Sequence, residues 1–217
     1  MVKRDPLQIG SDLLLLHEGT ADLKVLGALM RQAGIEGYQP IEVGGHSKLR
    51  ALLKALVLTP HFKTPVPGFE HPVRAVAVVL DAETNAEATF QSVRDALGAA
   101  GIPAPVTAGE IVEGPLKVGV FLVPDNQSAG KIESLCLDSV RDDPAWSCLD
   151  RFFACVRERG GVLPENMDKA SAQAFLATRP NPALPVGLAA EEGYWRFESV
   201  GFQKLAAFLR LVGAPQV

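Results

Sequence analysis

The sequence predicts an α/β protein built on a doubly wound, mainly parallel sheet of about four strands, with a helical C-terminal cap. Three observations lead to this prediction. Short apolar runs alternate with amphipathic stretches from residue 11 to residue 126. The two most apolar of the early runs end in carboxylates and are each followed by a helical pattern. The remainder of the chain has helical spacing only, broken by a proline-rich stretch.

The first half of the pattern covers residues 11–56. Four consecutive leucines within 11–16 are typical of a short buried strand. Residues 21–33 carry apolar side chains at helical spacing, and Gly34 is well placed to end that helix. A second strand is expected over 38–43, followed by a turn in which Ser47 is a candidate N-cap for a helix over 49–56.

The second half of the pattern contains the strongest strand of the chain. Residues 59–72 include four prolines and are expected to form a loop. Residues 73–80 are rich in β-branched side chains, which favours a strand. Thr84 is a candidate cap for the helix that follows, which ends before Gly101. A further strand is expected over 118–123.

The C-terminal part of the chain is predicted to be helical. Helical spacing begins at residue 132 and recurs over 149–156, 168–177 and 202–212, with a loop expected over 179–193. We therefore expect one domain over residues 1–217, with a core over about 10–135 and a cap over about 136–217. Cys136 and Cys155 lie among apolar residues and are expected to pack in this cap.

Composition limits the classes of function. The net charge is −4 and the sequence pI is about 5.6, so the whole chain does not attract nucleic acid and any phosphate-binding surface must be a local patch. The three cysteines form no paired spacing, which indicates neither a zinc nor a disulfide framework and fits a reducing cytosol. No apolar run approaches the ~18 residues of a membrane span, so we expect a cytoplasmic protein without membrane contact.

Carboxylates follow two of the expected strands at the points where they end. Glu18 comes after the leucine run, and Asp81 and Glu83 come after the strand over 73–80. Because the carboxyl ends of parallel strands meet at one edge of a sheet, these side chains are expected to face one cleft. Close carboxylates repel each other unless a cation neutralises them, and clustered oxygens suit Mg²⁺ or Mn²⁺. The sequence thus predicts a site for one or two such ions.

Several charged residues near these strand ends or further along the chain have an ordinary structural explanation. Glu18 can be a loop acid, whereas Asp22 and Glu83 can favour the start of a helix electrostatically. Glu133 can be a solvated helix acid, and Lys169 a surface charge. The segment 81–84 is also similar to a haloacid-dehalogenase phosphatase motif, in which the nucleophilic aspartate normally follows the first strand.

An ordered series of motifs carries a family resemblance. In chain order they are Glu18-Gly19 with Asp22, Gly44-Gly45 with Ser47, Asp81-Ala82-Glu83, Pro124-Asp125-Asn126 with Gly130 and Glu133, and Lys169 before Phe175-Leu176-Ala177. The series resembles the Toprim fold of topoisomerases, bacterial primases and OLD-family (overcoming lysogenisation defect) nucleases. It is most similar to small, uncharacterised Toprim-like proteins related to the OLD group. Glu83 stands where that family typically has a second aspartate, and Thr20 where a lysine is frequent.

The resemblance implies a metal-dependent phosphoryl-transfer enzyme that cleaves nucleic-acid phosphodiesters. It implies a general-base role for Glu18, stabilisation of phosphate charge by Lys169, and metal ligands among Glu18, Asp22, Asp81, Glu83 and Glu133. The alternative is a non-catalytic module that docks a partner such as an ATPase, or that binds nucleotide or nucleic acid without cutting it. OLD nucleases carry an ATPase domain, whereas this chain has no GxxxxGK[ST] motif.

Overall fold

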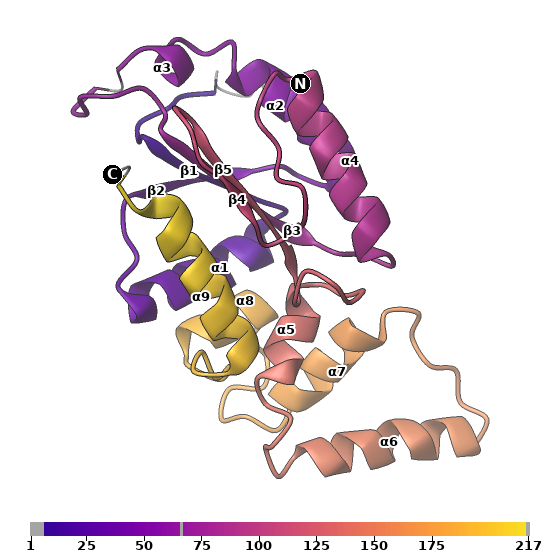
Figure 1. The fold of residues 1–217 in the computed structure, drawn as a ribbon. Coiled ribbons are helices and arrows are strands. Elements are labelled where there is room, and N and C mark those ends of the chain that lie inside the picture. The colour runs from indigo at the N-terminus through magenta and orange to yellow at the C-terminus, as the bar shows by residue number, and fades with distance from the viewer. Residues whose placement is uncertain (1–6, 66, 216–217) are drawn as a thin grey trace, which may run out of the picture.

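A computed structural model describes residues 7–65 and 67–215 of the chain. These residues form a five-stranded sheet with helices on both faces (Figure 1). The strand order is β2 (Tyr38–Glu42), β1 (Leu13–His17), β3 (Ala75–Asp81), β5 (Lys117–Val123) and β4 (Ile111–Val112). The first four of these strands are parallel, as predicted, and β4 pairs antiparallel with β5 at the edge. The sequence did not indicate β4 because two residues are too short for a periodic signal.

Each face of the sheet is covered by its own helices. The described helices are α1 (Thr20–Ala33), α2 (Leu49–Leu56), α3 (Pro60–Lys63), α4 (Ala86–Ala99), α5 (Ile132–Asp138), α6 (Trp146–Glu158), α7 (Met167–Leu176), α8 (Val186–Glu191) and α9 (Val200–Gly213). On one face, alternate residues of the central strands pack against α2 and α4. On the other face, the intervening residues pack against α1, α9 and the helices of the C-terminal part. Both faces of the central strands are therefore buried, which explains their continuous apolar sequences.

Helix α9 is a layer of the core as well as part of the C-terminal cap. It packs directly on β3 and β5, and the rings of Phe121 and Phe208 lie 5.4 Å apart. Gly119 of β5 makes this approach possible, because a Cβ atom there would lie 2.7 Å from side-chain atoms of Phe208 and Val212. The predicted helix over 202–212 is thus confirmed, and it closes one face of the sheet.

Local details of several elements differ from the sequence predictions. Helix α4 is capped by Asn85, not Thr84, and the Asn85 side chain accepts a hydrogen bond of 2.9 Å from the Ala88 N–H. Ser47 lies inside a short 3₁₀ turn, η1 (His46–Lys48), and caps no helix. Two stretches expected to be loops contain the helices α3 and α8. Pro60 and Pro185 stand at their starts, where a missing N–H costs nothing.

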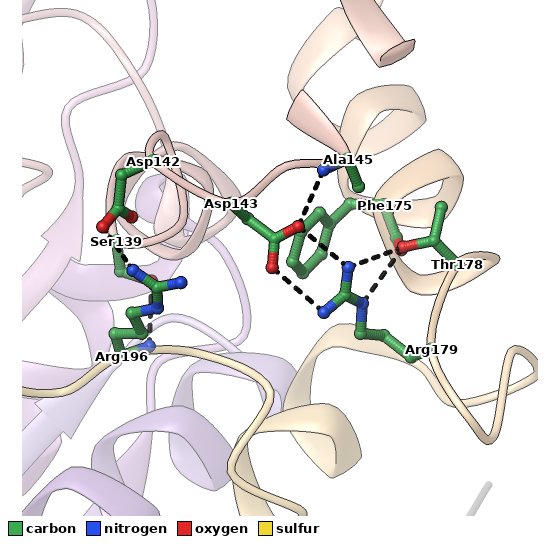
Figure 2. Close-up of polar contacts among 8 residues, drawn as sticks. All are labelled: Ser139, Asp142, Asp143, Ala145, Phe175, Thr178, Arg179 and Arg196. Atoms are coloured by element: carbon green, nitrogen blue, oxygen red, sulfur yellow. Dashed lines mark hydrogen bonds and ion pairs between the residues drawn. The ribbon is translucent and has the colours of Figure 1, made fainter. Parts of the chain in front are cut away.

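The turn between α5 and α6 is tied to the rest of the cap by two arginines (Figure 2). Arg179 donates two hydrogen bonds of 3.1 Å to the Asp143 carboxylate and stacks 4.2 Å from the Phe175 ring. Arg196 pairs with Asp142 nearer the surface. These contacts join segments far apart in sequence, and they position the start of α6.

The three cysteines are free, and only Cys136 is buried. Cys148 and Cys155 are exposed on α6, so the expectation that Cys155 packs in the cap is wrong. Helix α6 contributes one fully buried residue, Leu149, because a single side of the helix rests on the protein. Within the described residues, no helix is both long and apolar enough to cross a membrane.

Candidate metal centre at the carboxyl edge of the sheet

Three carboxylates meet at the carboxyl ends of the adjacent parallel strands β1 and β3. Glu18 directly follows β1, Asp81 is the last residue of β3, and Glu83 lies two residues further on. One carboxylate oxygen from each of the three side chains lies within 4.8 Å of the other two. The parallel pairing of the strands therefore brings together acids separated by more than sixty positions in the sequence.

A tight backbone turn holds Glu83 in place. Its φ of 55° lies in the left-handed region, which is uncommon for a residue other than glycine. The N–H groups of Glu83 and Gly130 each donate to the carbonyl oxygen of the other, at 3.0 and 2.8 Å. Gly130 is required there because its φ is 151° and a Cβ atom would lie 2.7 Å from Ser134 Oγ. The strained turn thus fixes the Glu83 carboxylate beside the strand ends.

Lys131 is the one ammonium group in direct contact with this cluster among the described residues. Its Nζ lies 2.7 Å from Glu83 Oε2, and both side chains are about one-third exposed. This hydrogen bond and the charge of Glu83 raise the pKa of Lys131, so the lysine stays protonated. No sequence pattern distinguished Lys131 from other surface lysines, although it stands directly after Gly130 in one of the family motifs.

Asp81 is the most deeply placed acid of the cluster. It is buried, and its Oδ1 accepts a hydrogen bond of 2.9 Å from the Ile132 N–H at the start of α5. Burial raises the pKa of this carboxyl to about 8. The charges of Asp22, Glu18 and Glu133 contribute to the rise, and Lys131 opposes it. Without an added cation, Asp81 therefore carries a proton at neutral pH.

Glu18 has a buried oxygen without a hydrogen-bond partner. Its Oε2 atom and the Nε2 atom of His46 are the two such side-chain atoms in the described part of the chain. Burial, then the charge of Glu83, raises the pKa of Glu18, whereas Lys131 and His46 lower it. An unpaired buried oxygen is costly unless a further group contacts it. His46, from the turn after β2, thus joins the surroundings of Glu18.

Asp22 and Glu133 flank the three carboxylates and are not members of the close group. Asp22 accepts a hydrogen bond of 3.1 Å from the Gly19 N–H, which ties it to the start of α1. It is buried, and burial raises its pKa to about 6, with Glu18 and Glu133 adding to the rise. Glu133 is partly exposed on α5. Both residues therefore add negative potential to the centre without sharing a ligand position in this geometry.

Lys169 is not brought into the cluster. It is exposed in the first turn of α7, and its backbone N–H donates to Asn166 Oδ1 at 2.9 Å. A cavity of about 540 Å³ lies between the Glu83 turn, residues 129–131 and the start of α7 at 165–168. Lys169 directly follows this lining segment in the sequence.

The Pro124-Asp125-Asn126 segment makes turns and contributes nothing to the carboxylate group. Asp125 accepts hydrogen bonds of 3.0 and 2.7 Å from the Gln127 and Ser128 N–H groups. Although partial burial opposes it, these bonds lower the pKa of Asp125. Asn126 accepts from the Leu122 N–H at 2.8 Å. This motif therefore shapes the exit from β5.

Comparison with known proteins gives a family and no function. The model of a family described as "Protein of unknown function (DUF3226)" matches residues 12–213. The chain belongs to that family. The match includes the whole sheet, every residue of the carboxylate cluster and Lys169. Searches of curated proteins and of solved structures gave no match.

Proposed function

We propose that this DUF3226 protein is a Mg²⁺- or Mn²⁺-dependent phosphoryl-transfer enzyme that hydrolyses nucleic-acid phosphodiester bonds, with the ion held by Glu18, Asp81 and Glu83. The observation that carries the proposal is the convergence of three carboxylate oxygens within 4.8 Å at the carboxyl edge of a parallel sheet. Ligands of open α/β sheets bind beyond this edge. The ordered motifs that resemble Toprim-like proteins support the same reaction class.

The chemistry of the donors fits a hard divalent cation. All three donors are carboxylates, and Mg²⁺ and Mn²⁺ prefer oxygen ligands. The unpaired Oε2 atom of Glu18 has a free coordination position. Asp81 is protonated at neutral pH because it is buried and because its neighbours are also acids, so a divalent ion would displace that proton and relieve the repulsion. Lys131 offsets only one of the negative charges.

When bound, such an ion supplies Lewis-acid stabilisation of phosphoryl oxygens and an activated water. The residues of the chain have separate tasks. Glu18 accepts the proton of the attacking water on the carboxylate oxygen that does not bind the ion. Lys131, on the cavity side of Glu83, places positive charge where a phosphate would enter. We assign to Lys169, which is exposed and directly follows the lining segment 165–168, the task of adding positive charge beside this cavity.

A local cationic patch must compensate for the acidic chain. The formal charge of −4 gives no general attraction for a polyanion. Lys48 and Arg50 follow β2 and Lys131 follows β5, and in the sheet these two strands flank β1 and β3, which carry the acids. The two groups of cations therefore follow strands on opposite sides of the cluster. We assign a nucleic-acid strand to the line from Lys48 and Arg50 past the carboxylates to Lys131.

The second candidate function is a non-catalytic module that binds a partner such as an ATPase, or a nucleotide, through the same edge. The ion pair between Lys131 and Glu83 at 2.7 Å favours it, because an ammonium group already occupies one of the three proposed ligands. In this case Lys131 is a permanent counter-charge for the acids, and no divalent ion enters.

Metal binding separates the two functions. Titration calorimetry with Mn²⁺ at pH 8 should show uptake by the native protein, loss of uptake in Asp81→Asn, and unchanged uptake in Glu87→Gln, an exposed acid of α4. Native protein should then cleave single-stranded DNA, duplex DNA or RNA in the presence of Mg²⁺ or Mn²⁺, and Asp81→Asn should not. Absence of Mn²⁺ uptake at millimolar concentration favours the binding module. Uptake without cleavage of any substrate refutes the hydrolytic step.

A further inference from the structure

Helix α6 lies along the outer edge of the C-terminal part, far from the sheet (Figure 1). It rests on the rest of the protein through one side, where Leu149 is buried and Trp146, Phe153 and Val156 are partly buried. Ala154 is also partly buried, and the remaining residues of the helix are exposed to solvent. The side turned away from the protein is therefore free to bind another surface.

A second apolar stripe lies on this exposed side. Its helical members are Cys148, Phe152 and Cys155, at intervals of four and three residues, and the C-cap residue Arg159 continues the spacing four residues further on. Both thiols are exposed and the Phe152 side chain is 54% exposed. A single exposed phenylalanine needs no explanation, but this alternation of intervals is the seam of a helix that packs against another helix.

We propose that α6 pairs antiparallel with α6 of a second copy of this chain. Arg151 and Glu158 stand seven residues apart on the same flank of the seam. In an antiparallel pair related by a two-fold axis, Arg151 of each copy faces Glu158 of the other, which gives two opposite-charge contacts. A parallel pair would place identical charges at the same level.

Neither of these two charges has an ion-pair partner in the described part of its own chain. Arg151 and Glu158 form no ion pair among the residues that the structure describes, and both are exposed. Glu158 is also the last residue of α6, where the helix dipole disfavours an acid. A cation supplied by a second copy accounts for an acid at this position.

The pairing also arranges the apolar stripe in layers. The two central layers each place Phe152 of one copy against Cys155 of the other, and the outer layers place Cys148 against Arg159. Helix α6 is about 20 Å long at a rise of about 1.5 Å per residue, so the contact is smaller than a standard interface. The dimer is therefore concentration-dependent. This inference is independent of the proposed function.

Charge reversal tests the register of the pair. Sedimentation of the native protein over a concentration series should show a reversible monomer–dimer equilibrium. Arg151→Glu and Glu158→Arg should each weaken it about tenfold, because two attractive contacts become two repulsive ones. The variant that carries both Arg151→Glu and Glu158→Arg should have a dimer dissociation constant within about threefold of the native value, since each contact is restored with its charges exchanged. Arg157→Glu, on the opposite side of α6, is the matched control and should leave the constant unchanged.

Thiol cross-linking tests the geometry in nearly native protein. In this register the two Cys155 residues are offset by three positions along the axis, or about 4.5 Å, and the two Cys148 residues by eleven positions, or about 16 Å. A short bifunctional maleimide should therefore join two copies of the Cys148→Ser variant through their Cys155 thiols. It should not join two copies of the Cys155→Ser variant, which keep only Cys148 on α6. Three results overturn the proposal: a monomer at every concentration, a dimer indifferent to these charges, or coupling through Cys148.

Discussion

Replacing Asp81 by asparagine should stabilise the metal-free protein at neutral pH. Burial, assisted by the charges of Asp22, Glu18 and Glu133, raises the pKa of Asp81 from 3.8 to about 8 in the folded chain. Between these two values the folded protein holds a proton that the unfolded chain has lost. This carboxyl therefore makes the free energy of unfolding fall as the pH rises from 3.8 towards 8. Asparagine carries no charge to neutralise, and its carbonyl still accepts the Ile132 N–H.

The size of the effect follows from the pH interval. Each pH unit between the unfolded and folded pKa values corresponds to about 1.4 kcal/mol. The native carboxyl therefore lowers the free energy of unfolding by about 2 kcal/mol at pH 5 and by about 4 kcal/mol at pH 7. The free energy of unfolding of Asp81→Asn should therefore exceed that of the native protein by an amount that grows over this range. Asp81→Ala should gain less stability than Asp81→Asn. It leaves the buried Ile132 N–H without an acceptor, which lowers the free energy of unfolding by about 1–3 kcal/mol.

Urea denaturation at pH 5, 6 and 7 without divalent ions measures the difference. The buried side chain of Trp195 reports the unfolding through its fluorescence. Added Mn²⁺ should stabilise the native protein and leave Asp81→Asn unchanged. A variant that is equally stable or less stable than the native protein at all three pH values would refute the reasoning, since the carboxyl would then impose no electrostatic cost on folding.

Three further substitutions test other parts of the account. Lys131→Ala should bind Mn²⁺ more tightly than the native protein in calorimetry, because it removes the ammonium group 2.7 Å from Glu83; weaker binding would contradict this. Gly119→Ala should lower the free energy of unfolding by about 1–3 kcal/mol in urea, because its Cβ would press on Phe208 and Val212 of α9, whereas Gly98→Ala, which meets no atom, should not. Arg179→Ala should lower the free energy of unfolding by about 1–3 kcal/mol, because it removes a bidentate, partly buried contact with Asp143 (Figure 2). Arg196→Ala should lower it by less than about 1 kcal/mol, because its partner Asp142 is largely exposed. Equal losses of stability in the two variants would contradict this distinction.

The central sheet could be predicted from the sequence because its strands are buried on both faces. Continuous apolar runs such as Leu13–Leu16 are typical of strands that are buried on both faces, and the helices between them have clear periodicity. The two-residue strand β4 could not be predicted because it is too brief for a pattern. The short helices α3 and α8 are also brief, and they begin at or directly after a proline. Cys155 was misplaced because an apolar sequence on α6 does not reveal which of its stripes faces the protein.

Part of the candidate site could also be anticipated. The parallel order of β1 and β3 is enough to place Glu18 near Asp81. The role of Lys131 could not be foreseen, because its contact with Glu83 depends on a left-handed turn paired with Gly130. The distance of Lys169 from the carboxylates likewise depends on how α7 packs, which local sequence does not encode.

The most direct test of the account is a crystal structure grown with Mn²⁺, with anomalous scattering used to locate the ion. The proposed site predicts a peak at the carboxyl edge of the sheet, bound by oxygens of Glu18, Asp81 and Glu83 at about 2.1 Å, with Lys131 moved away from Glu83. An anomalous map without a peak at this edge, with Lys131 still bound to Glu83, would contradict it.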